Sequence, residues 1–214
     1  MADPLAKNTA TTAEEAAKIV PRAEFRVFGP GVIDLVKGKM WNGKTVLFQA
    51  RKMPAETYFL STHTNEANVK VRDGLLDIKT KVGETPEGYE IFQPRGKFQF
   101  PVKKADLQTI LANLKVEMPL EKDTYTIDEF IAMARRHPDT TAVTVEKMRY
   151  GFTIDGVICE YAQVWFNGAM VESACAESEN YAGLKTVVEG LGIAAMPNTN
   201  YLKAAKRVVG MDSR

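Results

Sequence analysis

The sequence predicts an α+β fold in which roughly eight mainly antiparallel strands close into a barrel with peripheral helices. Three turn dipeptides, Asp73-Gly74, Asp155-Gly156 and Asn167-Gly168, each separate two arms in which apolar and polar residues alternate. Asp-Gly and Asn-Gly are preferred two-residue turns of β-hairpins, so the strands that they join are expected to be antiparallel. Eight strands in an open sheet would leave two unpaired edges, which closure into a barrel removes.

The individual elements follow from the spacing of apolar residues along the chain. Apolar residues three and four positions apart, as at Leu107, Ile110, Leu111 and Leu114, predict a helix over 104–114. The expected strand segments are 22–28, 46–49, 57–62, 68–72, 75–82, 89–92, 97–102, 142–152, 157–166 and 169–178. The expected helices are 12–20, 32–40, 104–114, 126–136, 181–191 and 200–209.

The chain is expected to form one folded unit. Residues 1–21 are predicted to be a leader with a short helix, which Thr12 caps and Pro21 ends. Residues 22–210 are predicted to be a single domain, because we find no internal repeat and no linker long enough to separate domains.

Composition excludes several classes of protein. Among 214 residues, 28 Lys and Arg balance 27 Asp and Glu, which disfavours a strongly basic nucleic-acid binder. No apolar run approaches the roughly 18 residues of a membrane span, and the start lacks the pattern of a secretory signal. Cys159 and Cys175 have no CxxC spacing, so free thiols and a cytoplasmic location are expected. A homo-oligomer is compatible with this composition, which does not determine the oligomeric state.

Charged residues repeat at every second position of several strands, which places them on one face of each strand. On a single strand, solvated surface charges are the simplest explanation. If four such strands line a closed barrel, burying these charges costs free energy unless an anion or a metal ion binds to them. Arg and Lys suit phosphate, and carboxylates suit Mg²⁺ or Mn²⁺. The repeating residues are Arg22, Glu24, Arg26, Lys70, Arg72, Asp77, Lys79, Lys81, Lys147 and Arg149.

The order of these motifs over residues 22–209 resembles the triphosphate tunnel metalloenzymes, also called CYTH-domain proteins. That family includes inorganic triphosphatases, thiamine triphosphatases and class IV adenylyl cyclases. Its members typically open with a Glu-x-Glu-x-Lys strand, for which Arg22-Ala-Glu24-Phe-Arg26 stands here. The hairpin of basic strands and the later basic and acidic strands are matched by Val69-Lys-Val-Arg72, Leu76-Asp-Ile-Lys79, Lys147-Met-Arg149-Tyr and Asp155-Gly-Val-Ile-Cys-Glu160.

The sequence departs from the family pattern on two strands. Arg22 replaces the first glutamate of the opening strand, and Arg26 replaces its lysine. On the late acidic strand, one register puts Ser173 and Cys175 where the family usually carries alternating glutamates. That register leaves Glu177 and Glu179 on the same face, while Glu172 points the other way.

The resemblance implies a metal-dependent phosphohydrolase that acts on inorganic triphosphate or a small organic triphosphate, in a mechanism that uses Mg²⁺ or Mn²⁺. It implies that Glu24 and Glu177 are catalytic. The implied metal ligands are Glu24, Glu160, Glu177 and Glu179. The implied substrate-binding residues are Arg26, Arg72, Lys79, Lys147 and Arg149, with Lys70 and Lys81 less favoured.

Two alternatives stay open at this point. A tunnel with too few carboxylates would bind polyphosphate or a nucleotide without cleaving it, as a sensor or scaffold. An assembly protein would instead fill its charged barrel with internal ion pairs. A zinc site is disfavoured, because His63 and His137 lie far apart without ligand spacing.

Overall fold

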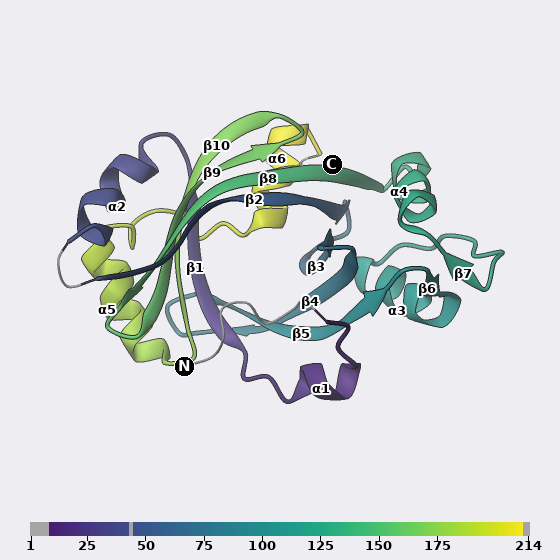
Figure 1. Ribbon diagram of the computed structural model, residues 1–214, viewed down its shortest axis with the longest axis horizontal. Helices are drawn as coiled ribbons and strands as arrows, with labels where there is room; N and C mark the ends of the chain where they lie inside the picture. Colours follow the sequence, from purple (N-terminus) through teal and green to yellow (C-terminus); the bar gives the residue numbers. More distant parts are fainter. Residues whose placement is uncertain (1–8, 43–44, 212–214) are drawn as a thin grey trace.

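The computed structural model describes residues 9–42 and 45–211, so residues 1–8 of the predicted leader and residues 43–44 lie outside the described part. Within that part, eight antiparallel strands form a closed barrel in the order β1-β10-β9-β8-β2-β3-β4-β5 (Figure 1). The predicted α+β barrel is therefore confirmed. The barrel strands are β1 (Arg22–Phe28), β2 (Val46–Ser61), β3 (Thr64–Arg72), β4 (Leu75–Glu84), β5 (Glu90–Gln99), β8 (Thr140–Ile154), β9 (Val157–Phe166) and β10 (Ala169–Ser178).

Two strand predictions were wrong in the same way. The predicted segments 46–49 and 57–62 belong to one strand, β2, and the segments 89–92 and 97–102 fall mostly within β5. Pro54 lies in a register shift of β2, where the chain needs no ladder hydrogen bond from its missing N–H. A bulge interrupts alternation without ending a strand, which explains why the pattern looked like two segments. The short pair β6 (Val102–Lys103) and β7 (Thr124–Tyr125) forms a separate small sheet.

The predicted hairpin turns are confirmed by their backbone geometry. Asp73, Asp155 and Asn167 have φ angles of 50°, 48° and 48°, and each is followed by a glycine with positive φ. Two successive residues with positive φ define the type I′ turn, whose twist matches that of antiparallel strands. These turns therefore set the register of β3–β4, β8–β9 and β9–β10.

All six predicted helices are present in the described part of the chain. The capping box of Thr126 and Glu129 begins α4, and Gly192 in the left-handed conformation ends α5. None of the helices described has the length and apolar content needed to span a bilayer. The helices are α1 (Ala13–Ala17), α2 (Val32–Met40), α3 (Lys104–Leu114), α4 (Ile127–Arg136), α5 (Tyr181–Leu191) and α6 (Tyr201–Val209).

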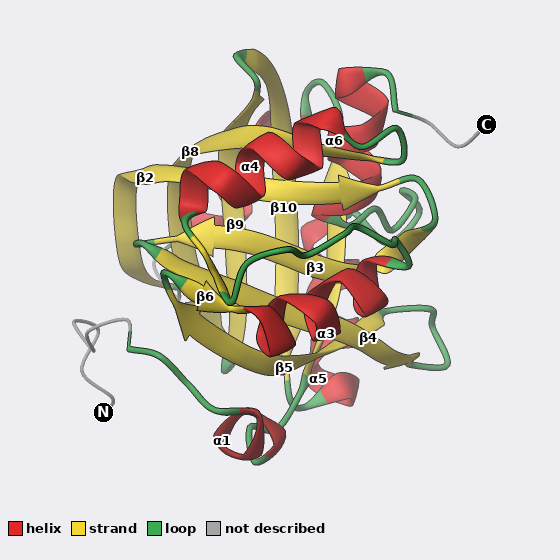
Figure 2. Ribbon diagram, turned by 90° about the vertical axis from the view of Figure 1, so that its right-hand side faces the viewer, coloured by secondary structure: helices red, strands yellow, loops and turns green. Residues whose placement is uncertain are grey.

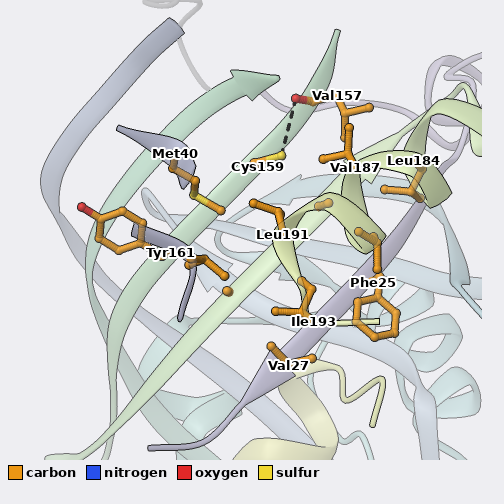
Figure 3. Packing of buried hydrophobic residues seen from close by; sticks show 14 of the residues in the cluster. Phe25, Val27, Met40, Val157, Cys159, Tyr161, Leu184, Val187, Leu191 and Ile193 are labelled. Carbon is orange, nitrogen blue, oxygen red and sulfur yellow. Dashed lines mark hydrogen bonds between the residues drawn. The ribbon is translucent and has the colours of Figure 1, made fainter. Parts of the chain in front are cut away.

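Most of the hydrophobic core lies outside the barrel wall, between strands and helices. Helices α2 and α5 cover β1, β9 and β10, and Figure 3 shows Phe25 and Val27 of β1 close to Leu184 and Leu191 of α5. Helices α3 and α4 cover another part of the wall (Figure 2). Because these outward faces are buried in hydrocarbon, the alternating charged residues are left facing the interior.

Along two strands, β8 and β9, the inward face changes from apolar to charged. On β8, Val145 packs with α6, whereas Lys147, two residues further on, lines a cavity. On β9, Val164 belongs to the same apolar cluster and Glu160 lines the cavity. Helix α6 therefore fills one end of the barrel interior, and charged side chains occupy the rest.

Candidate active site

The charged end of the barrel encloses a cavity with two adjoining parts. The larger part has a volume of about 450 Å³ and the smaller part about 160 Å³. The two parts share much of their lining, so we treat them as one site and name them the larger and the smaller part. The shared residues are Glu24, Arg26, Asn68, Arg72, Asp77, Lys79, Glu177 and Tyr201.

Barrel closure brings together the basic residues that the resemblance implied. Four strands, β1, β3, β4 and β8, supply them. All five predicted phosphate-binding side chains line the smaller part, together with Lys70, which was less favoured. Lys81 instead lies beside Glu84 and Glu90. The basic lining residues are Arg26, Lys70, Arg72, Lys79, Lys147 and Arg149, and the acidic ones are Glu24, Glu56, Asp77, Glu160 and Glu177.

Glu160 is engaged by two guanidinium groups. Its carboxylate lies 3.2 Å from Nη1 of Arg26 and 2.5 Å from Nε of Arg149. Burial tends to raise the pKa of Glu160, but these two arginines outweigh burial and hold the pKa below its usual value. Nε of Arg26 also donates to Glu24 at 2.6 Å. Glu160 thus holds two arginines inside the barrel.

Glu56 forms a second buried ionic cluster, which the sequence reasoning missed. Its carboxylate accepts hydrogen bonds from Nζ of Lys70 at 3.2 Å and Nζ of Lys147 at 2.8 Å. Burial would raise the pKa of Glu56, yet the two lysines lower it to about 2. Burial lowers the pKa of Lys70 to about 7, with Lys147 adding to the effect against the attraction of Glu56. Two cations therefore share one carboxylate.

Glu177 has the opposite environment, because its neighbour carries the same charge. Glu24 on β1 is its direct cross-strand partner. Burial, and then the charge of Glu24, raises the pKa of Glu177 more than Lys79, Arg22 and Arg26 lower it. Nη1 of Arg22 lies 3.4 Å from Oε1 of Glu177. Arg22 also lies 3.7 Å from Glu179, an exposed residue. Glu24 and Glu177 thus form a carboxylate pair that a cation would stabilise.

The register expected for β10 is the one observed. The side chain of Ser173 faces the interior and accepts a hydrogen bond from Arg26 at 3.2 Å. Cys175 is paired with Arg26 across the strands and is buried. Glu172 points outward and accepts a hydrogen bond from the backbone N–H of Ile33 at 3.0 Å, beside the start of α2. The inward face of β10 therefore brings Glu177, and Glu179 directly after the strand, to the larger part of the cavity, while Ser173 and Cys175 occupy the preceding inward positions.

The acidic residues fit a metal ion that is shared with a substrate. Within residues 9–42 and 45–211, no group of three or more His, Cys, Asp or Glu side chains is arranged to hold a metal. Mg²⁺ keeps several waters and is usually bound by one or two carboxylates together with phosphate oxygens. Glu24 and Glu177 supply such a pair, each with one arginine beside it, whereas both oxygens of Glu160 are engaged by arginines.

Three polar atoms in the cavity wall lack a partner among the described residues. Nε of Arg72, the hydroxyl of Tyr201 and Oδ1 of Asn68 are buried and make no hydrogen bond there. All three residues line both parts of the cavity. Buried polar atoms are nearly always paired, so two unpaired donors and one unpaired acceptor on residues that line a cavity indicate a polar ligand.

Tyr201 also organises the cations around it. The guanidinium carbon of Arg26 lies 4.6 Å from the centre of its ring, and Nζ of Lys147 lies 4.5 Å from it. Sequence reasoning missed Tyr201 because it comes from α6, outside any strand pattern. Glu56 and Tyr58 were not among the predicted site residues, although they belong to the segment that matches the family's second strand and alternation along β2 places them on one face.

Comparison with known proteins gives structural matches alone. No protein-family model matches the sequence, and no curated protein matches it significantly. A conserved hypothetical protein of Pyrococcus furiosus is 14% identical with a TM-score of 0.49, over 85% of this chain and 98% of that one. A putative adenylyl cyclase from Hippeastrum, described as having a dominant triphosphatase activity, is 13% identical with a TM-score of 0.44, over 90% and 96%.

A putative adenylate cyclase from Bacillus halodurans is similar at 12% identity, with a TM-score of 0.42 over 87% of this chain and 98% of that one. Similarity at this level concerns the course of the chain. The functional proposal below therefore rests on the side chains in the cavity.

Proposed function

We propose that the protein binds a linear triphosphate inside the barrel and hydrolyses it with the help of Mg²⁺ or Mn²⁺. The observation that carries this proposal is the pair of unpartnered donors, Nε of Arg72 and the hydroxyl of Tyr201, among six basic side chains in one cavity. A bound phosphate supplies the acceptors that these donors lack. Arg provides a fork of donors and Lys a point charge, and both suit phosphate oxygens.

The basic residues have distinct roles in this proposal. Arg72 is held by Asp77 through its Nη2 at 2.7 Å, which leaves Nε free to donate to a phosphate oxygen. Arg26 is fixed between Glu24 and Glu160, so its guanidinium is positioned before the ligand arrives. Lys79, Lys147 and Arg149 complete the cradle. Such prior positioning lowers the entropy that binding costs.

Glu24 and Glu177 would hold the divalent cation against the phosphate oxygens. The cation would neutralise charge on the transferring phosphoryl group. Because the pKa of Glu177 is raised, its carboxylate is also a suitable acceptor for the proton of an attacking water. Glu160 and Glu179 keep supporting roles, the first by holding Arg26 and Arg149, and the second beside Arg22.

Phosphate release from inorganic triphosphate tests this function directly. The wild-type chain should release phosphate with Mg²⁺ or Mn²⁺ and stop when EDTA is added. Glu24→Gln and Glu177→Gln should each abolish turnover. Glu172→Gln is the matched control, because Glu172 lies on the same strand as Glu177 and faces α2. Turnover that survives in Glu177→Gln would overturn the catalytic assignment.

Binding without hydrolysis is the second candidate function. It is favoured because Glu56, Asp77 and Glu160 are already paired with lysines or arginines of the cavity. It is also favoured by Ser173 and Cys175 at the inward positions of β10. In that case triphosphate would raise the melting temperature with or without a divalent cation, and no phosphate would be released. If the melting temperature does not change when triphosphate is added, both functions are overturned. The remaining alternative is then an assembly protein whose barrel is filled by internal ion pairs.

A further inference from the structure

One wall of the larger part of the cavity is formed by residues that precede the barrel strands. Residues of the leader segment, from Thr11 to Pro21, line it beside β5. Ile19 and Val20 are there 47% and 57% exposed, which is unusual for aliphatic side chains next to a charged cavity. Phe92 and Pro94 of β5 continue the apolar wall. We call Ile19, Val20, Pro21, Phe92 and Pro94 the apolar collar.

Several contacts hold the leader in this position. The side-chain amide of Gln93 donates to the carbonyl oxygens of Ala16 at 2.8 Å and Ile19 at 2.9 Å. Thr11 and Lys97 exchange two backbone hydrogen bonds, at 3.0 and 2.9 Å. Gln93 faces away from the cavity and is itself buried. The leader is thus docked on β5 through groups outside the cavity, while Ile19 and Val20 remain exposed to it.

The two parts of the cavity differ in what they can bind. Most of the side chains around the smaller part are charged, and its volume is about 160 Å³. The larger part has about 450 Å³, a size typical of small-molecule sites, and combines the collar with part of the basic cradle. A bare triphosphate gains nothing from exposed aliphatic side chains, because apolar surface favours only apolar ligand surface.

We propose that the apolar collar receives the organic group of a triphosphate ester, so that the leader makes the site selective for organic over inorganic triphosphate. This inference rests on the proposed function, because the cradle must first hold the triphosphate. The organic group would contact Ile19 and Val20 on the leader side and Phe92 on the strand side. The leader is then a specificity element, which the charged strands alone would not provide.

Calorimetric titration with ATP and with inorganic triphosphate, both in EDTA to prevent turnover, tests the inference. We expect the double variant Ile19→Ser/Val20→Ser to lose about tenfold in affinity for ATP, while its affinity for inorganic triphosphate changes less than about twofold. Leu35→Ser is the matched control: Leu35 is also an exposed aliphatic residue, at 43%, but it lies on α2 away from the cavity. This control should change neither affinity.

A second variant keeps the test independent of the collar side chains. Gln93→Leu removes both hydrogen bonds to the leader and should lower the affinity for ATP more than that for inorganic triphosphate. The collar inference is overturned if both ligands weaken in parallel, or if the double variant still binds ATP as wild type does. Failure of wild type to bind inorganic triphosphate would instead overturn the proposed function itself.

Discussion

Glu56 and Glu177 line the same cavity, yet their environments are opposite. Glu56 lies between Lys70 and Lys147, which hold its pKa at about 2. Glu177 lies beside Glu24, and burial together with this neighbour raises its pKa. A carboxylate that is fully paired stabilises the fold and has little capacity left for a ligand. A carboxylate beside a like charge is repelled by it, and binding a cation or a proton relieves this repulsion.

This difference separates a structural cluster from a reactive one. The Glu56 cluster keeps two lysines inside the barrel before any ligand binds. The Glu24–Glu177 pair is poorly matched without a ligand, as is common at functional sites. If the comparison is right, neutralising each carboxylate will change stability in opposite directions.

The largest effect is expected at Glu56. Glu56→Gln leaves Lys70 and Lys147 without their shared counter-charge, and such a loss in a buried ion pair costs about 3–5 kcal/mol. The melting temperature should fall by roughly 10 °C in a scan at pH 7. Added triphosphate should restore more of this loss than it adds to wild type, because it replaces the missing anion.

Glu146→Gln is the control for Glu56→Gln, since its ion pair with Lys52 joins exposed side chains 3.5 Å apart. Exposed pairs contribute little, so its melting temperature should change by about 1 °C or less. Equal melting temperatures for the two variants would show that Glu56 does not stabilise the fold.

Glu177→Gln should lower turnover at least about 100-fold and raise stability at pH 7. The folded-state pKa of Glu177 is raised above 4.5, so the folded chain binds more protons than the unfolded chain just above that pH. Its contribution to the free energy of unfolding therefore falls as pH rises through this window. Glutamine removes that penalty, so its melting temperature should exceed that of wild type at pH 7, and the difference should shrink towards pH 4 in scans from pH 4 to 8. A lower melting temperature at pH 7 would contradict the comparison.

A smaller effect is expected at Tyr201, whose hydroxyl is buried without a partner among the described residues. Tyr201→Phe keeps the ring beneath Arg26 and Lys147 and removes a buried donor that no described residue satisfies. The melting temperature without ligand should stay equal or rise, while the dissociation constant for triphosphate rises about threefold to tenfold. Unchanged affinity in a calorimetric titration would show that the hydroxyl does not meet phosphate.

The smallest effect concerns the proton on Lys70. Its pKa of about 7 means that the amine is mostly neutral at pH 7.5, and a nearby triphosphate would raise that pKa. Binding should therefore take up roughly half a proton or more at this site. Titrations in buffers with different ionisation enthalpies, compared with Lys70→Met, isolate this uptake from protons that the ligand itself releases. Identical proton counts in the two proteins would show that Lys70 does not respond to the ligand.

Much of the fold was predictable because it depends on local chemistry. Asp73-Gly74 and Asn167-Gly168 accept the positive φ angles of a tight turn, and alternation then places Ser173 and Glu172 on opposite faces. The basic residues could be chosen for the same reason, since alternation needs only nearest neighbours along the strand. The long strand β2 was divided in the prediction, because a bulge disturbs the same pattern.

The sequence by itself determined the hairpins, the helix ends and which residues of each strand share a face, because these depend on a few neighbouring residues. Only the tertiary structure decided which charges meet. Closure of the barrel put Glu24 beside Glu177, brought Lys147 of β8 to Glu56 of β2, and placed Tyr201 of α6 among the cations. These contacts join segments far apart in the chain, and strand periodicity says which way a side chain points but not what it will face.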